Sequence, residues 1–318
     1  MGVTLADVAI DVRCGPGTEP LGDAFLPADG PVGVADGAAT LTLTMRIDAA
    51  HLDLLVSGDE DGSEHRRSGE AHAWIVPRPR HLQRFMPARG SGGGPEAELV
   101  VDATSCEDGT VRARPAVHAV ATWAAARGVM PVHAAAVARD GRALLLVGRG
   151  GRGKTTTALT LAGRGWRLIA DDVCFLEATP TGTVVHGLYA TAVLTAATVE
   201  GLGAAGWEGL GRTHGGKHAF RLPPELPVAR SAMLGAVVTV GHGDGDPYRL
   251  TELPRGTARA AWLGAFAPAL QTHGPTPAWL GASARAVREH PVARLTLGWD
   301  AGRLDDVLSA LLAGGGGR

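Results

Sequence analysis

The sequence predicts an α/β protein made of two parts, and two observations carry this prediction. Residues 1–128 hold short alternating segments between turn-rich stretches and end in one helix, which indicates a β-rich N-terminal domain. From residue 129 onward, apolar segments of strand length alternate with segments of helix length, which is typical of α/β folds. We expect this second domain to span residues 129–313, and residues 314–318 (GGGGR) to form a disordered tail.

The N-terminal region contains four strand candidates and one helix. Residues 40–47 (TLTLTMRI) alternate apolar and polar residues, the pattern of a half-buried strand. Shorter segments predict further strands at residues 52–56, 71–76 and 98–101. Residues 115–127 begin with proline and are followed by Gly128, which are boundary signals of a helix. No catalytic constellation is visible in this region.

The second region opens with a predicted hairpin. An apolar strand over residues 132–138 leads through an Asp-Gly turn into residues 143–147 (ALLLV), a fully buried strand. Residues 155–162 are expected to form a helix and residues 167–170 a short strand. Further strands are predicted at 173–177, 184–188, 219–222, 234–240 and 292–297, and further helices at 255–270, 277–289 and 301–313.

Composition excludes several classes of protein. The chain has 318 residues, 45% of them hydrophobic, which is enough for a sizeable core. A net charge of −2 gives no bulk attraction for nucleic acid or an anionic membrane, and no apolar run reaches membrane-spanning length. Three scattered cysteines argue against a disulfide framework and predict a cytoplasmic location. Homo-oligomerisation is left open.

Lysine is scarce in this chain. Of 30 basic residues, 28 are arginine, and the two lysines are Lys154 and Lys217. This bias is typical of strong GC pressure on the codons. A lysine that survives it is more often one whose compact ammonium arginine cannot replace.

Residues 148–155 (GRGGRGKT) match the phosphate-loop pattern G-x-x-x-x-G-K-[ST]. The glycines let successive N–H groups point at one anion, and the following helix adds its N-terminal dipole. Lys154 is then expected to reach the β- and γ-phosphates of ATP, and the Thr155 hydroxyl to ligate Mg²⁺. The expected nucleotide contacts are Gly148, Arg149, Gly150, Gly151, Arg152, Gly153, Lys154, Thr155 and Thr156. For the two arginines, simple solvation is an open alternative.

A competing interpretation uses the same glycines. Gly148, Gly150 and Gly153 also satisfy G-x-G-x-x-G, and Asp171 follows about 20 residues later, as in a dinucleotide-binding fingerprint. An NAD-dependent oxidoreductase is therefore an alternative. In that fold the helix packs closely on the strand after the third glycine, and Lys154 is poorly suited to this packed position. We therefore favour a nucleoside triphosphate as the ligand. A non-catalytic nucleotide sensor is a further alternative.

Three more residues are candidates for the chemistry. Asp171 and Asp172 follow the strand that should return beside the loop, where one carboxylate can accept a hydroxyl proton and the other can hold Mg²⁺. Elsewhere such a pair is usually a solvated turn. His133 lies in the strand expected to hairpin into residues 143–147. By position alone, a core histidine and an active-site histidine are equally open.

Residues 132–173 resemble the HPr kinase/phosphorylase superfamily, which is related to phosphoenolpyruvate carboxykinase. The shared pattern is a strand with His, a hairpin, the phosphate loop, a helix, and R-G-x-x-L-[VI]-x-D-D. The resemblance implies a P-loop kinase domain that transfers phosphoryl from ATP, with Mg²⁺, to a Ser or Thr hydroxyl of a protein or peptide. It also implies roles for the site residues: Asp171 as general base, His133 and Lys154 as catalytic partners, Thr155 and Asp172 at the metal.

Departures from the family pattern bear on the substrate. Many members have Ser where Gly150 stands, and the segment after Val185 lacks the Leu-Glu-x-Arg-Gly signature of true HPr kinases. The N-terminal region also differs from theirs. The chain therefore looks more similar to diverged relatives, some of which phosphorylate precursor peptides of peptide-modification pathways, and HPr is not the expected substrate.

Lys217 lies in a glycine-flanked segment, residues 215–222 (GGKHAFRL). A solvated loop cation is the ordinary fate of a lysine. The scarcity of lysine and the neighbouring glycines make a phosphate or nucleotide contact an equally open interpretation.

Overall fold

The computed structural model describes residues 1–6, 8–26, 40–55, 63–88, 93–242, 248–254, 256–257, 260, 262–264, 277–298 and 301–314. The chain divides into two compact units. The first consists of Met1–Arg127, Leu188–Val199 and Ala205–Leu222. The second consists of Gly128–Gly187, Glu200–Ala204 and Pro223–Arg318.

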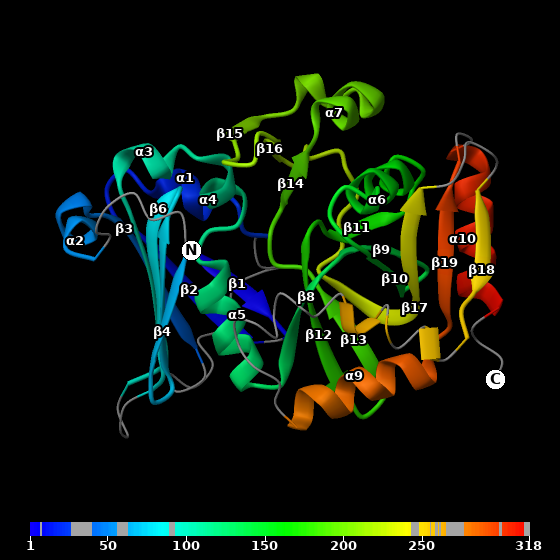
Figure 1. Ribbon diagram of the computed structural model, residues 1–318, viewed down its shortest axis with the longest axis horizontal. Helices are drawn as coiled ribbons and strands as arrows, with labels where there is room; N and C mark the ends of the chain where they lie inside the picture. The colour runs from blue at the N-terminus through cyan, green and yellow to red at the C-terminus, as the bar shows by residue number, and fades with distance from the viewer. Residues whose placement is uncertain are drawn as a thin grey trace. The chain divides into compact units, whose positions relative to one another are not determined.

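The first unit is built on a seven-stranded mixed sheet in the order β1-β2-β3-β7-β6-β5-β4 (Figure 1). Its strands are β1 (Gly2–Leu5), β2 (Val8–Cys14), β3 (Leu41–Ile47), β4 (Glu64–Ser68), β5 (Ala71–Pro77), β6 (Arg80–Met86) and β7 (Glu96–Val101). The alternation in residues 40–47 correctly predicts β3, because Leu41, Leu43 and Met45 are fully buried and the residues between them are not. Strand β3 pairs in parallel with both β2 and β7.

Short helices accompany this sheet. They are α1 (Glu19–Gly22), α2 (Ala49–Asp53), α3 (Ala103–Cys106), α4 (Gly109–Ala113) and α5 (Val117–Ala126). The helix predicted at residues 115–127 is confirmed as α5. The strand predicted at residues 52–56 is wrong, because Asp48 caps α2 there by accepting a hydrogen bond from the His51 amide. Residue 56 lies outside the described residues.

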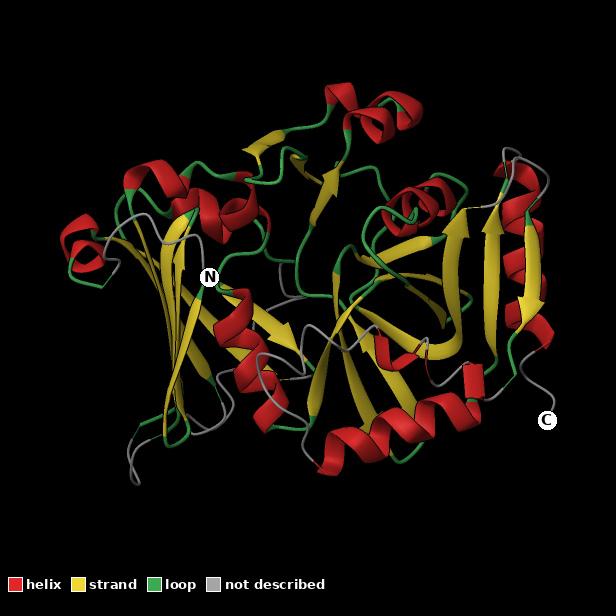
Figure 2. Cartoon of the chain, viewed as in Figure 1, coloured by secondary structure: helices red, strands yellow, loops and turns green. Residues whose placement is uncertain are grey.

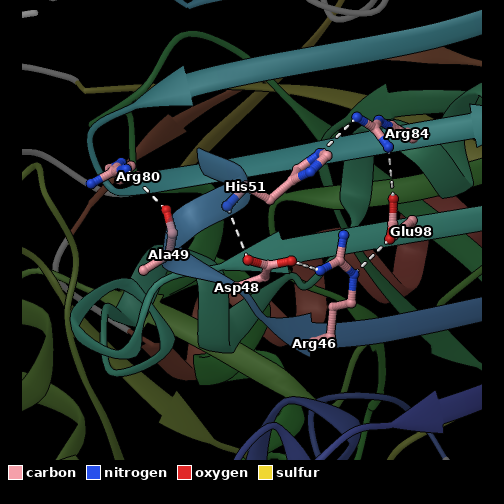
Figure 3. A network of polar contacts seen from close by, with 7 residues as sticks. All are labelled: Arg46, Asp48, Ala49, His51, Arg80, Arg84 and Glu98. Atoms are coloured by element: carbon pink, nitrogen blue, oxygen red, sulfur yellow. Dashed lines mark hydrogen bonds and ion pairs between the residues drawn. The ribbon is translucent and has the colours of Figure 1, made fainter. Parts of the chain in front are cut away.

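A network of charged side chains ties α2 to the sheet (Figure 3). Arg46 on β3 donates from Nε to Glu98 Oε1 at 2.8 Å and also pairs with Asp48. Arg84 on β6 donates to Glu98 Oε2 at 3.3 Å and to His51 Nε2 at 2.8 Å. Each arginine therefore holds two partners, and the backbone adds a further tie, because the Asp48 amide donates to the Val101 carbonyl at 2.9 Å.

A small three-stranded sheet also belongs to the first unit. Its strands are β14 (Thr191–Leu194), β15 (Gly209–Arg212) and β16 (His218–Arg221), in the order β14-β16-β15. Leu210 and Ala219 bury themselves against Ala113 of α4, and the Thr191 hydroxyl donates to the Ala113 carbonyl at 2.7 Å. The second domain is therefore not the continuous stretch 129–313 that we expect from the sequence.

The second unit is built on a nine-stranded mixed sheet. Seven of its strands follow the order β11-β9-β10-β17-β13-β12-β8, β19 also pairs with β17, and β18 pairs with β19. They are β8 (Val129–His133), β9 (Ala135–Arg139), β10 (Arg142–Val147), β11 (Arg167–Ala170), β12 (Val173–Thr179), β13 (Gly182–His186), β17 (Ser231–His242), β18 (Arg249–Glu252) and β19 (Val292–Leu297). The α/β prediction for this part of the chain is confirmed.

The strand predicted at residues 132–138 is in fact two strands. The chain breaks at Ala134, whose amide donates to the Asp172 carbonyl at 3.1 Å. Before the break β8 pairs with β12, and after it β9 pairs with β10. His133 therefore ends β8 and does not lie in the hairpin strand where the sequence places it.

Helices α6 (Lys154–Ala162), α9 (Pro277–Glu289) and α10 (Ala301–Gly314) flank the second sheet (Figure 2). The sequence predicts all three within a residue of these bounds, whereas most of the helix predicted at 255–270 and all of residues 315–318 lie outside the described residues. Asp305 anchors α10, because its Oδ1 accepts from Trp166 Nε1 and from Arg139 Nη1, each at 2.6 Å. Helix α6 runs beside β9 and β11. Its first turn lies near the carboxyl end of β10, because only residues 148–153 separate the two elements.

Candidate functional site

A glycine loop, residues 148–153, joins β10 to α6. Gly148, Gly151 and Gly153 have φ values of +142°, +75° and +93°, in the region that favours glycine. A Cβ at Gly153 would lie 2.4 Å from Leu297 Cδ1, and one at Gly148 would lie 3.1 Å from the Val240 carbonyl oxygen. Three glycines of the motif are therefore required by the shape of the loop.

Gly150 differs from the other loop glycines. It has no positive φ, and a Cβ there would meet nothing within 4 Å. A side chain at this position is compatible with the loop. Arg149 and Arg152 are both exposed, so the loop presents two guanidinium groups to solvent.

Lys154 is the first residue of α6 and is buried, with 7% of its surface exposed. Its ammonium donates to the carbonyls of Gly148 at 2.7 Å and Arg149 at 3.3 Å. It also contacts His133 Nε2 at 3.3 Å. The lysine thus lies inside the curve of the glycine loop and links the loop to β8.

Asp171 and Thr155 form the second contact of the site. The Thr155 hydroxyl donates to Asp171 Oδ1 at 2.6 Å, and Asp171 is 7% exposed. Asp171 directly follows β11, which pairs with β9 rather than with β10. The sequence prediction that the end of this strand returns beside the loop is confirmed.

Asp172 occupies a strained turn. Its φ is +71°, and the Val173 amide donates to the Asp171 carbonyl at 2.9 Å, which closes a γ-turn around Asp172. This turn brings Asp172 Oδ1 to 3.1 Å from His133 Nδ1. Backbone strain of this kind in a non-glycine residue is concentrated at functional sites.

His133 links the lysine to the second aspartate. An ammonium can only donate, so the contact with Lys154 needs an unprotonated Nε2 on the imidazole. The proton of the neutral ring then sits on Nδ1, where it is donated to Asp172. Lys154, His133 and Asp172 form a chain of hydrogen bonds in one consistent direction.

Cys174, two residues after Asp172, is fully buried and is not a reactive thiol. Its thiol donates to the Ala134 carbonyl at 3.2 Å. Burial raises the pKa of the Cys174 thiol well above its usual value, and the charge of Asp171 acts in the same direction. The thiol stays protonated and is not a nucleophile. All three cysteines are free.

Two other residues, Thr156 and Lys217, are also predicted to contact the nucleotide. Thr156 follows Thr155 in the first turn of α6 and is half-buried. Lys217 belongs to the first unit, where it is exposed next to the turn between β15 and β16, and its amide is bonded to Thr213 Oγ1 at 3.1 Å.

His242 is a site residue that the sequence does not point to. It ends β17, and its Nε2 lies 3.0 Å from the Gly151 carbonyl oxygen. Strand β17 pairs in parallel with β10, so the carboxyl ends of the two strands meet at the glycine loop. The pairing of β10 with β17 is what places His242 beside the loop, and this pairing cannot be inferred from the spacing of residues along the sequence.

These elements define an α/β protein in which an interior strand of a mixed sheet leads through a glycine loop into a helix. A family model described as "SynChlorMet cassette protein ScmC" matches residues 100–201, which include the loop and both aspartates. The chain is similar to the structure of the HPr(Ser) kinase/phosphatase from Coxiella burnetii, with 14% identity, a TM-score of 0.30, and coverage of 58% of this chain and 95% of that one. No curated protein matches the chain. Among the described helices, none is both long and apolar enough to cross a membrane.

Proposed function

We propose that this chain is a kinase that transfers the γ-phosphoryl group of ATP to a Ser or Thr hydroxyl of a protein or peptide. One observation carries the proposal. Lys154, Thr155, Asp171, Asp172 and His133 come from separate segments of the chain and gather at the first turn of α6, beside the glycine loop. A phosphate-binding lysine, a metal-binding hydroxyl, and carboxylates for the metal and for the acceptor hydroxyl recur in enzymes of phosphoryl transfer.

The glycine loop and Lys154 would bind the triphosphate. The positive φ values at Gly148, Gly151 and Gly153 turn the backbone tightly enough for successive N–H groups to face one anion. The Lys154 ammonium, now bonded to loop carbonyls, would exchange these partners for the β- and γ-phosphate oxygens. The dipole of α6 adds to the attraction for the phosphates.

The chemical step moves one proton and one phosphoryl group. The acceptor hydroxyl oxygen bonds to the γ-phosphorus, the bond from that phosphorus to the β–γ bridging oxygen breaks, and ADP leaves with the electron pair. The hydroxyl proton passes to an aspartate carboxylate. Lys154 lowers the energy of the charge that develops on the transferred group, so catalysis is by positioning and electrostatics.

The residues present suit a magnesium ion. Mg²⁺ is held in such enzymes by one or two carboxylates with the substrate phosphates, and the Thr155 hydroxyl lies 2.6 Å from the Asp171 carboxylate. When bound, the ion neutralises charge on the phosphate oxygens. Among the described residues no group of three or more His, Cys, Asp or Glu is arranged to hold a metal, so the phosphates would have to complete the shell.

The contacts favour a division of work between the aspartates that differs from the one implied by the resemblance. Asp171 touches Thr155, the expected metal ligand, so we infer that Asp171 holds the metal with it. Asp172 touches His133, which orients its carboxylate, and not the Thr155 hydroxyl, so we infer that Asp172 accepts the hydroxyl proton.

The oxidoreductase alternative fits the sheet less well. In a dinucleotide-binding unit the strands before and after the helix are parallel and near each other in a βαβ unit, and the acidic residue after the second strand faces the ribose. Here β9 lies between β10 and β11, antiparallel to both. Asp171, the acidic residue in question, is bonded to Thr155 instead.

A protein or peptide acceptor remains part of the proposal. The matched family is described as a cassette protein, which supports a search for the acceptor among the products of neighbouring genes. A cytoplasmic location follows from the cysteine usage and is proposed with it.

Incubation with γ-labelled ATP, Mg²⁺ and serine peptides from neighbouring genes tests the proposal. We expect label on serine with the wild-type chain and none with Lys154→Ala. Calorimetry with ATP and NAD is run in parallel. Tight ATP binding with no transfer to any acceptor would favour the nucleotide sensor, and preference for NAD over ATP would overturn the kinase proposal.

A further inference from the structure

The histidine at the end of β17 contacts the glycine loop from outside the group of residues described above. His242 Nε2 lies 3.0 Å from the Gly151 carbonyl oxygen, and since a carbonyl only accepts, the imidazole is the donor. The side chain of His242 is exposed, and its partner is 91 residues earlier in the chain. The contact therefore serves the loop and not the core.

This hydrogen bond sets the orientation of one peptide group. In a trans peptide the carbonyl of one residue and the N–H of the next point in opposite directions. With the Gly151 carbonyl directed at His242, the N–H of Arg152 must point to the opposite side. Gly151 has a φ of +75°, and a Cβ added there would meet nothing within 4 Å, so no steric contact at Gly151 fixes this peptide.

The ends of the loop are held differently. Gly148 lies against the Val240 backbone, and Gly153 lies against Leu297, which is the register partner of His242 in the β17–β19 pair. Both are close steric contacts. The contact at Gly151, in the middle of the loop, is polar and directional, and it comes from the end of β17, the strand that also carries Val240.

We propose that His242 is a positioning residue of the glycine loop: it holds the Gly151–Arg152 peptide so that the Arg152 N–H faces the phosphates of the nucleotide. The proposal rests on the proposed function, because it needs a phosphate ligand in the loop. Its structural half, the restraint of the loop, can be tested on the protein without any nucleotide.

Three variants separate the roles that His242 can have. His242→Ala removes the donor. His242→Gln keeps an amide N–H at nearly the distance of Nε2 but cannot act as a titrating group. His214→Ala is the matched control, since His214 is also exposed but lies in the first unit.

The first measurement is limited trypsin digestion of the free protein, with cleavage after Arg149 and Arg152 followed by mass spectrometry. Both arginines are exposed, so the rate reports how often the loop leaves its folded shape. We expect His242→Ala to be cut about fivefold faster, the effect of losing one hydrogen bond, and His242→Gln and His214→Ala to match the wild type. Equal rates for His242→Ala and the wild type would overturn the proposal.

The second measurement is the Kd for ATP and, once an acceptor is known, kcat. A positioning role predicts weaker ATP binding in His242→Ala, again about fivefold, with recovery in His242→Gln. A fall in kcat with an unchanged Kd would overturn it and make His242 a catalytic residue. If His242→Ala loosens the loop but the wild type binds no nucleotide, the proposed kinase function and the phosphate half of this inference fail together, while the restraint of the loop stands.

Discussion

The hydroxyl of Thr155, in the first turn of α6, donates to the carboxylate of Asp171, at the end of β11, across 2.6 Å. The next residue, Asp172, faces the other way and contacts His133. Two adjacent carboxylates are thereby given different neighbours by a single strained turn. This separation underlies the first two predictions.

Asp171→Asn and Asp172→Asn should lower activity in different ways, one through the Mg²⁺ requirement and the other through kcat. Loss of the Asp171 charge should raise the Mg²⁺ concentration needed for half-maximal activity about tenfold or more, because it weakens the proposed metal ligand. Loss of the Asp172 charge should lower kcat while leaving that Mg²⁺ concentration unchanged. Mg²⁺ titrations of the labelled-ATP assay check this. The reverse pattern would restore Asp171 as the base.

His133→Ala should lower kcat by about 10- to 100-fold, the usual effect of losing charge-assisted hydrogen bonds. ATP binding should change little, because in the free protein the Gly148 and Arg149 carbonyls still hold Lys154 at the loop, where it can exchange them for phosphate oxygens. The matched control is His186→Ala, which removes another histidine–carboxylate pair of the second unit, with Glu177 at 3.0 Å. Equal losses in both variants would mean that His133 acts only on stability.

Gly153→Ala and Gly150→Ala compare a required glycine with a free one. At Gly153 the φ of +93° and the 2.4 Å approach to Leu297 Cδ1 should reduce the free energy of unfolding by about 1–3 kcal/mol. Gly150→Ala should stay within about 0.5 kcal/mol of the wild type. Urea unfolding measures both. Gly153→Ala made in a Leu297→Ala background should cost less than in the wild type, by the part of the loss that is due to the contact, and should keep the part due to φ.

The first unit should lose stability as the pH falls from about 6.5 toward 4. Burial, partly opposed by a hydrogen bond to Pro79, lowers the pKa of His81 to about 4, so between these values the unfolded chain binds a proton that the folded chain does not. A shift from 6.5 to about 4 corresponds to at most about 3 kcal/mol. Urea unfolding from pH 7.5 to 4.5 should show a smaller decline in His81→Leu than in the wild type. Parallel declines would contradict this assignment.

Lys217→Arg tests whether Lys217 contacts phosphate, as the scarcity of lysine in this chain suggests. If Lys217 contacts phosphate, the bulkier guanidinium should weaken ATP binding several-fold even though the charge is kept. Arg212→Lys, an exchange in the opposite direction on the neighbouring strand, is the control and should have no effect. Calorimetry with ATP measures both. An unchanged Kd in Lys217→Arg would identify Lys217 as a solvated cation.

The site could be predicted from sequence wherever its residues are close along the chain. The glycines, Lys154 and Thr155 form one contiguous motif, and Asp171 follows through a helix and a strand of predictable length. His133 was found, but on the wrong strand, because the break at Ala134 depends on a hydrogen bond to Asp172, which lies 38 residues later.

The errors in predicting the fold also come from contacts that the local sequence pattern does not show. Residues 52–56 have the composition of a strand, but the cap from Asp48 begins a helix that runs to Asp53. Strands β14 (TAVL) and β15 (GLGR) have only four residues each and no long apolar run, so their place in a sheet is decided by packing on α4. Contacts of that range cannot be found by periodicity.

The assembly of the first unit from three stretches of chain has a consequence for its synthesis. Its long sheet is complete when Arg127 has been made, but the small sheet that covers α4 ends only at Leu222, 95 residues (222 − 127) later. At about 5–20 residues per second, that interval is about 5–20 s on the ribosome. During this time the small sheet is not yet there to cover α4, and the glycine loop that precedes Lys154 is made before the first unit can be completed.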